Sequence, residues 1–295
     1  IPLWDSLNLV MVAISTGGFT LHAGGLGYYH NPVLEALLIP VMLAGAVPFK
    51  IFFFLYNGKV REMLKDRIVR ILLFIAFTGS LITSLDLYMF SNLALPDAFR
   101  QGTFMAVSGL CTCGLQNSNP HAWAVIPLAV VALMMVIGGA MGSTAGGVKV
   151  NRVIMVYEGI RWWFRRFFVS SRVTVPLRFG GKTVSKELSE LAISKNLLVI
   201  VVYFVTIIIT TILTLHLYIT SFRLEEVMFE LVSALSNVGL SVGFINPASP
   251  VTIKWLFTLL MWLGRLEIVP VIIIFMGAIK GIQNDLANTA PPGHL

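Results

Sequence analysis

A short apolar run that ends in a small, glycine-containing turn occurs three times in this chain, and it constrains the fold more than any other feature. The copies span residues 8–20, 102–116 and 226–241, and each lies between longer apolar segments. A run of this length is too short to cross a bilayer, which requires about 20 apolar residues in a helix. The pattern therefore predicts three re-entrant helices that enter a membrane, turn and leave as extended chain.

The aligned turns share a glycine that is followed by an apolar residue. Non-helical backbone is tolerated at membrane depth only where it is buried in protein or lines water, and glycine presents its carbonyl without a side chain in the way. Such turns around one axis would form a ring of carbonyls that replaces the hydration shell of an ion. We therefore interpret them as an ion-selectivity filter, in preference to glycine loops at the ends of amphipathic surface helices. The predicted filter residues are Thr16, Gly17, Gly18, Thr112, Cys113, Gly114, Asn237, Val238 and Gly239.

The composition is that of an integral membrane protein. Hydrophobic residues make up 57% of the chain and charged residues only 12%, whereas soluble domains carry about 25% charged residues. Two cysteines, Cys111 and Cys113, are too few for a disulfide framework and lack the paired spacing of a zinc site. The histidines are scattered and no nucleophile–base pair is present, so the sequence predicts neither an enzyme nor an organic cofactor.

The net charge of +7 is concentrated in two clusters, at residues 59–70 and 149–195. The loops that carry the glycine turns hold few basic residues. By the positive-inside rule, the basic loops face the cytoplasm and the filter turns face outside. The charge therefore sets the topology in the membrane lipid and requires no nucleic-acid partner. Because the chain starts almost at a re-entrant helix, we expect it to be part of a longer chain.

Long apolar segments predict membrane spans at residues 32–55, 68–88, 197–218 and 252–279, and a further span that begins at residue 123 and breaks at Gly138. Pro40, Gly45 and Pro48 are expected to bend the first span. A polar cytoplasmic linker is predicted at residues 170–195.

The second re-entrant helix is predicted to start at Pro96 and Asp97, and the third to span residues 222–235. The third carries Glu225, Glu226 and Glu230 in its first half. These carboxylates either favour the helix N-terminus or concentrate cations at the outer mouth.

The span that begins at residue 123 is interrupted by the stretch GGAMGSTAGGVK. Its five glycines disfavour a helix by about 1 kcal/mol each, and the helical pattern resumes at Val148. A phosphate-binding P-loop is excluded, because Val148 separates the last glycine from the lysine and no Ser or Thr follows. The stretch provides either close helix packing through small residues or a loop that lines the pore below the filter, and its length favours the loop. The predicted gate-loop residues are Gly138, Gly139, Gly142, Ser143, Thr144, Gly146, Gly147 and Lys149.

Two charged residues, Arg265 and Glu267, lie near the middle of the last predicted span. An ionised side chain at this depth costs several kcal/mol unless it faces water or a partner. Residues two positions apart lie on different helix faces, so the two side chains do not readily neutralise each other. We interpret Arg265 as a positive barrier in a water-filled pore, and Glu267 as a residue with a structural partner on a neighbouring helix.

Span, re-entrant helix, filter turn and span form the potassium-channel-type unit, here repeated in one chain. The sequence resembles the Trk/Ktr/HKT superfamily of potassium transporters, most closely its TrkH/TrkG branch. The resemblance rests on STGGF at residues 15–19, GSTAGGVK at residues 142–149 and GRLEIVP at residues 264–270. It covers essentially the whole chain in family order.

The resemblance implies an all-α membrane protein with tandem channel-like units around a pseudo-four-fold pore. It also implies K+ as the transported ion, a homodimer in a prokaryotic inner membrane, and a cytosolic regulatory subunit that binds nucleotide. The glycine-rich break matches the family's intramembrane gate, and Arg265 matches its pore-facing arginine. The chain departs from the family at Cys111, Cys113, Asn237 and Val238. The expected regions are a second pore unit at 1–60, a third at 61–170, a linker at 171–195, a fourth unit at 196–285 and a tail at 286–295.

The sequence thus predicts a potassium uptake transporter with three of four pore units present. Gly18, Gly114 and Gly239 favour K+, whereas a serine at the key glycine of the first unit would mark Na+ transport. Two alternatives stay open: a Na+-permeable or non-selective cation transporter of the same fold, and a non-conducting membrane receptor or assembly subunit.

Overall fold

The computed structural model describes residues 1–22, 24–91, 93–168, 177–179, 182–184, 186–267, 270–271, 273–274 and 276–277. Over these residues the regular secondary structure is helical apart from one antiparallel hairpin, in which β1 (Leu177–Phe179) pairs with β2 (Lys182–Val184). The α-helices are α1 (Leu3–Ser15), α2 (Pro32–Ala46), α3 (Lys50–Tyr56), α4 (Val60–Lys65), α5 (Arg67–Phe90), α6 (Leu95–Leu110), α7 (Val125–Ile137), α8 (Val150–Phe167), α9 (Lys186–Leu217), α10 (Leu224–Leu235) and α11 (Val251–Leu266). Short 3-10 helices cover Gly25–Tyr29 and Pro120–Ala122.

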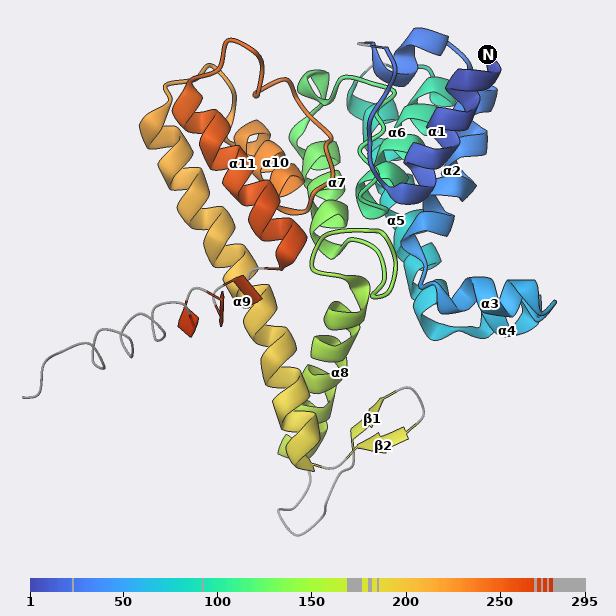
Figure 1. Cartoon of the computed structure of the whole chain (residues 1–295), viewed down its shortest axis with the longest axis vertical. Helices are drawn as coiled ribbons and strands as arrows, with labels where there is room; N and C mark the ends of the chain where they lie inside the picture. Colours follow the sequence, from blue (N-terminus) through green and yellow to red (C-terminus); the bar gives the residue numbers. More distant parts are fainter. Residues whose placement is uncertain are drawn as a thin grey trace, which may run out of the picture.

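The helices repeat one order: a long helix, a shorter helix, a turn and a returning helix. The sets α5–α6–α7 and α9–α10–α11 contain all of these parts, and α1–α2 contains the shorter helix, the turn and the returning helix. Within each set the helices pack on one another, and successive sets meet through α2 against α6 and through α7 against α10. The sets therefore follow one another around the molecule, with α7 near the centre (Figure 1).

Two of the described helices are long and apolar enough to cross a membrane, namely α5 and the Glu190–Leu217 part of α9. The side chain of Asp66 caps α5 by accepting hydrogen bonds from the amides of Ile68 and Val69. At the start of α6, Pro96 occupies the first turn together with Asp97, as predicted. Proline suits this position because its missing N–H would have no partner inside the helix.

The span predicted at residues 32–55 is not one helix. It consists of α2 and α3, which are bent by 113° at a break of a few residues. Pro48 lies in the break and Val47 before it is extended (ψ 154°), as expected for a residue that precedes proline. Pro40 lies inside α2 without interrupting it, so only one of the two prolines marks the bend.

The last predicted span, residues 252–279, is also wrong as a continuous helix. α11 ends at Leu266, and the next residue, Glu267, has a positive φ of 62°. Arg265 therefore lies in the last turn of α11 and not in the middle of a span. The predicted end of this span, 278–279, is outside the described residues.

Other boundaries differ less. α9 begins at Lys186, so the predicted linker at 170–195 contains the β1–β2 hairpin and the first turns of this helix. α10 begins at Leu224, and the carboxylate of Glu226 in its first turn accepts a hydrogen bond from the amide of Arg223 (2.8 Å). The predicted break at Gly138 is confirmed, since α7 ends at Ile137, whereas α8 begins at Val150, two residues after the predicted Val148.

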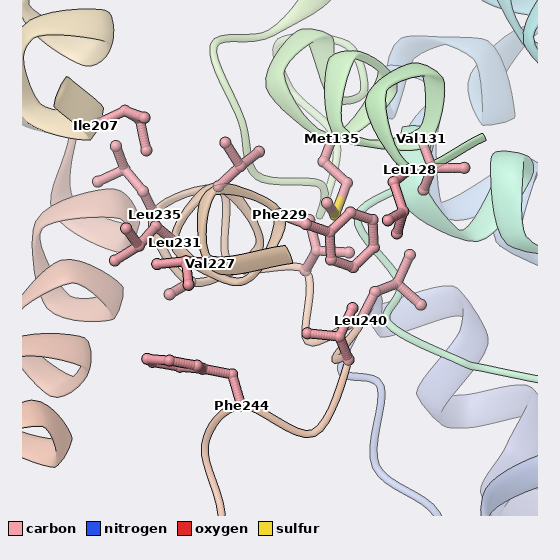
Figure 2. Packing of buried hydrophobic residues seen from close by; sticks show 14 of the residues in the cluster. Leu128, Val131, Met135, Ile207, Val227, Phe229, Leu231, Leu235, Leu240 and Phe244 are labelled. Carbon is pink, nitrogen blue, oxygen red and sulfur yellow. The ribbon is translucent and has the colours of Figure 1, made fainter. Parts of the chain in front are cut away.

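Helix α10 is at the centre of the larger apolar cluster. Its Phe229 points toward Leu128, Val131 and Met135 of α7 (Figure 2). All four side chains are buried, with Phe229 at 1% exposure. Burial of apolar surface contributes about 25 cal/mol per Å², so this contact stabilises the packing of α10 against α7. The packing places the predicted third turn relative to the predicted second.

Candidate functional site

The three predicted filter turns share one backbone conformation. The first residue of each turn is left-handed: Thr16, Thr112 and Asn237 have φ of 54°, 52° and 55°. The glycine two positions later is also left-handed, with φ of 73° at Gly18, 78° at Gly114 and 95° at Gly239. L-residues other than glycine rarely adopt this region. The repeated pattern in the sequence therefore corresponds to a repeated backbone geometry.

The same hydrogen bond closes each turn. The amide of the residue between these two left-handed positions donates to the carbonyl five residues earlier: Gly17 to Val12 (3.0 Å), Cys113 to Ser108 (2.9 Å) and Val238 to Ser233 (2.9 Å). This six-to-one bond ends a helix by satisfying a carbonyl that has lost its intrahelical donor. This bond ends each of the three helices α1, α6 and α10, and the chain continues from the turn without helical structure.

The turns lie directly against one another in chain order. A Cβ on Gly18 would be 2.5 Å from the carbonyl oxygen of Cys113, and one on Gly114 would be 2.0 Å from that of Val238. A side chain at either position would therefore collide with the backbone of the next turn. The glycines of the first two turns are required by this close approach as well as by their φ.

Two cavities border the turns. One of about 440 Å³ lies between the first and third turns and is lined by Gly17, Gly18, Phe19 and residues 237–241, among others. The other, of about 450 Å³, lies at the first and second turns and is lined by Gly18, Gly114, Gln116 and Asn117, among others. Backbone groups and amide side chains dominate the second cavity, which suits a cation that exchanges water for oxygen ligands.

The predicted gate loop, residues 138–149, lies against the turns. The amide of Gly146 donates to the hydroxyl of Thr112 (2.7 Å), and the hydroxyl of Thr16 lies 3.1 Å from the carbonyl of Thr144. A Cβ on Gly146 would lie 2.2 Å from the carbonyl of Ser236, just before the third turn. The loop therefore contacts the beginning of all three turns.

The other side of the loop is bound to the end of α2. The amides of Ala140 and Thr144 donate to the carbonyls of Ala46 (2.9 Å) and Gly45 (3.3 Å), and the amide of Phe49 donates to the carbonyl of Gly142 (2.8 Å). The last carbonyls of a helix have no intrahelical donor. The loop amides therefore replace the helical N–H donors that these α2 carbonyls lose where the helix breaks at Pro48.

Glu267 joins the last helix to the end of the gate loop. Its carboxylate forms ion pairs with Lys149 (3.4 Å) and with Arg152 of α8. The predicted structural partner of Glu267 on another element is confirmed. Arg265 is exposed, and the described part of the chain gives it no ion pair; next to it, Gly264 packs against the carbonyl of Leu235 at the third turn.

The acidic residues of α10 have partners on the outer side of the site. Glu226 is 1% exposed and pairs with Arg223 (3.0 Å) and His121 (2.8 Å). Glu230 is buried and accepts hydrogen bonds from the hydroxyl of Ser241 (2.7 Å) and the amide of Val242 (2.9 Å). These contacts favour the structural alternative for both residues, because they bind the helix start and the irregular segment after the third turn.

Sequence reasoning missed two serines that support the turns. The hydroxyl of Ser108 donates to the carbonyl of Leu115 (2.7 Å), and the hydroxyl of Ser233 accepts from the amide of Gly239 (3.1 Å). Both lie four positions before the first turn residue, where the first copy has Val12. Aligning the second and third copies over this position would have shown the serine that these two copies share. Arg152 was also missed, and no local signal distinguishes it from the other basic residues of α8.

Known proteins are similar to this chain in sequence and in fold. The sequence profile of the TrkH family, described as cation transport proteins, matches residues 1–280. An uncharacterized cation transporter of Methanocaldococcus jannaschii is 26% identical over 276 residues, which cover 93% of this chain and 54% of that protein. The potassium uptake protein TrkG of Escherichia coli is 26% identical over 284 residues, covering 94% of this chain and 56% of that protein.

A solved structure has the same fold. The crystal structure of the potassium transporter TrkH from Vibrio parahaemolyticus superposes with a TM-score of 0.77 at 24% identity, covering 92% of this chain and 58% of that chain. The chain thus spans about half the length of the curated relatives it matches.

Proposed function

Because this chain belongs to the TrkH family of cation transport proteins, we propose that it forms the filter and the gate of a potassium uptake transporter. The observation that carries the proposal is the repeated left-handed turn at Thr16, Thr112 and Asn237, with a left-handed glycine two positions on. Three turns of one geometry, packed side by side at membrane depth, present backbone carbonyls to a common space. Dehydrated K+ passes such carbonyls because they replace its water ligands.

The loop at residues 138–149 is the gate in this proposal. Its contacts with Thr16, Thr112 and Ser236 support a closed position directly below the filter. Permeation then requires that the loop leave these contacts. The exposed guanidinium of Arg265, next to the third turn, acts as an electrostatic barrier that a passing cation must displace.

The assembly is proposed from the family. The pseudo-four-fold pore would take its second, third and fourth units from residues 1–60, 61–170 and 196–285, and a further filter turn would fit at the cavity between the first and third turns. A homodimer in a prokaryotic inner membrane, with a nucleotide-binding regulatory subunit on the cytoplasmic side, completes the proposal. The basic segments at 59–70 and 149–195 support that orientation.

The experiment is a reversal-potential measurement on the full-length protein in planar bilayers, with K+ on one side and Na+ on the other. A potential near the K+ limit is expected. Gly114→Ser should lower the selectivity, because the new side chain collides with the carbonyl of Val238. Gly243→Ser is the matched control, since Gly243 has φ of 86° and open space around its Cβ position. A potential near zero with measurable current would overturn the K+ assignment in favour of a non-selective pathway.

The non-conducting alternative makes a separate prediction. If the protein is a receptor or assembly subunit, Arg265→Ala and deletion of residues 138–147 leave cation flux unchanged. If it is a transporter gated as proposed, both changes raise flux.

A further inference from the structure

Two threonines in the filter turns adopt a backbone conformation that is unfavourable for their residue type. Thr16 and Thr112 have φ of 54° and 52°, in the left-handed region where a β-branched residue is an outlier. The third turn has Asn237 at this position with φ of 55°, and asparagine tolerates the region well. Because one backbone geometry accommodates either residue, the turn itself does not require threonine. A strained residue of this kind points to a role for its side chain.

The hydroxyl groups of these threonines face the gate loop. The amide of Gly146 donates to Oγ1 of Thr112 at 2.7 Å, and Thr112 is only 1% exposed. Oγ1 of Thr16 lies 3.1 Å from the carbonyl oxygen of Thr144 and 2.7 Å from that of Ser15, so it shares its proton between the two. The bond at Thr112 is therefore the stronger of the two contacts.

The turn without a threonine lacks such a bond. Within the described residues, the side-chain nitrogen of Asn237 is buried without a hydrogen-bond partner, and it lies beside Gly264 of α11. The loop meets this turn through the packing of Gly146 on the carbonyl of Ser236 and on Cβ of Asn237. Threonine thus occurs at the two turns where the first side chain bonds the loop, and asparagine at the turn where it does not.

We propose that the hydroxyls of Thr112 and Thr16 are a latch that holds the glycine-rich loop against the inner end of the filter, with Thr112 as its main element. The inference rests on the proposed role of the loop as a gate and adds the residues that keep it closed. The latch residues belong to the filter itself, so loop position and filter geometry share a hydrogen bond. A change that weakens the bond must shift both, because coupling between two sites is reciprocal.

The direct test is hydrogen–deuterium exchange of peptides covering residues 138–149, in the full-length protein in lipid nanodiscs. Thr112→Val keeps the shape and the β-branch, and hence the backbone strain, but removes the hydroxyl. It should speed exchange of the loop by about 3- to 10-fold, the effect of one lost hydrogen bond. Thr112→Ser keeps the hydroxyl and should exchange like the wild type.

Two further variants provide a comparison for the effect of Thr112→Val on loop exchange. Thr16→Val should have a smaller effect than Thr112→Val, and it serves as the test if Thr112→Val is not recovered folded by size-exclusion chromatography. Thr20→Val removes a hydroxyl that bonds the carbonyl of His22 on the loop after the first turn, and it should leave loop exchange unchanged. Equal loop protection in wild type, Thr112→Val and Thr16→Val would overturn the latch.

K+ flux of the same variants in proteoliposomes separates the latch from the gate. Faster loop exchange together with a 3- to 10-fold rise in flux, about the same single-bond effect, supports both. Faster exchange without a rise in flux supports the latch and overturns the loop as a gate. A rise in flux without faster exchange overturns the latch, because the hydroxyl then acts on conduction in some other way.

Discussion

Two returning helices of this protein are broken, and the breaks differ in kind. Between α2 and α3 the chain turns by 113° through a break that contains Pro48, and α3 and α4 then lie to the side of the bundle (Figure 1). Between α7 and α8 the chain forms the long glycine-rich loop, which lies against the three left-handed turns. The first break is a corner, whereas the second is a loop that contacts these turns.

The difference follows from the residues in each break. Proline removes one amide and holds its φ near −65°, so the corner has few alternative conformations. In the loop, Gly138, Gly142 and Gly147 have positive φ, and Gly146 touches the backbone of Ser236. Glycine loses more conformational freedom on ordering than any other residue. A glycine loop is therefore held by its contacts rather than by its own stiffness, and it can leave when those contacts are lost.

Each break is also fixed by an ion pair at its far end. Lys50 follows the corner and pairs with Asp66 (2.7 Å), while Lys149 ends the loop and pairs with Glu267 (3.4 Å). The corner pair joins the start of α3 to the N-cap residue of α5. The loop pair joins the end of the glycine-rich loop to the residue that follows α11.

The largest effect is expected for Gly146→Ala. A methyl group would lie 2.2 Å from the carbonyl of Ser236, and such overpacking against backbone costs up to about 3 kcal/mol. The loop should leave the filter and K+ flux should rise strongly. The matched control is Gly142→Ala, where φ is 75° but the space around the Cβ position is open. If both variants raise flux equally, the contact of Gly146 with the third turn does not hold the loop, because Gly142 has no such contact.

A smaller effect is expected for Glu267→Gln, which leaves the guanidinium of Arg152 without its anionic partner. Arg152 is 9% exposed, and losing a charged hydrogen bond costs about 1.5–3 kcal/mol. Thermal unfolding should shift to lower temperature and loop exchange should increase. Glu62→Gln, at an exposed residue 3.9 Å from Lys59, should change neither. An unaltered melting temperature for Glu267→Gln would show that the loop does not depend on the last helix.

The corner itself is tested by Pro48→Ala. A new amide at position 48 allows α2 to continue. In a continued helix the amide of Phe49 would no longer donate to the carbonyl of Gly142. It would instead compete with the amide of Thr144 for the carbonyl of Gly45. The net change is expected to be about 1 kcal/mol, seen as modestly faster exchange of residues 138–149. Pro40→Ala, inside α2, should leave the loop unchanged. Equal exchange in both variants would mean that the corner and the loop are independent.

The smallest effect concerns pH and the corner pair. Burial alone would raise the pKa of Asp66, but Lys50 and the amides of Ile68 and Val69 outweigh it and hold this pKa below its ordinary value of 3.8. The carboxylate therefore contributes stability that is present above its ordinary pKa and is lost as the pH falls through the lower folded value. Asp66→Asn should lower the melting temperature slightly at pH 7, and this difference should disappear in acid below the lowered pKa of Asp66. A difference that persists in acid would contradict this account.

Much of this architecture follows from local sequence. The glycine two positions into each turn predicted a sharp, non-helical backbone, and Gly18, Gly114 and Gly239 are all left-handed. The five glycines of the loop predicted the end of α7 at the correct residue and the start of α8 within two residues. Apolar length predicted the long helices α5 and α9. These features depend on the conformational range and hydrophobicity of neighbouring residues, which the sequence states directly.

The last helix shows where such reasoning fails. An apolar run from residue 252 onward predicted one continuous span, yet α11 ends at Leu266 and Glu267 is left-handed. Its carboxylate lies against Lys149 and Arg152, more than a hundred residues earlier in the chain. Hydropathy averages over a window and contains no information about such a partner, so the break could not be seen from the sequence.

By itself, then, the sequence determined the repeated turns, the glycine break and the apolar helices, because each of these is set by residues adjacent in the chain. Only the tertiary structure decided which of them meet. Three sets of contacts require two elements to be packed at hydrogen-bond distance. They are the bond between Gly146 and Thr112, the bonds of the loop amides to the carbonyls of Gly45 and Ala46, and the ion pairs of Glu267. A donor and an acceptor attract one another only over a few ångströms, and the packing of the pore units brings them that close.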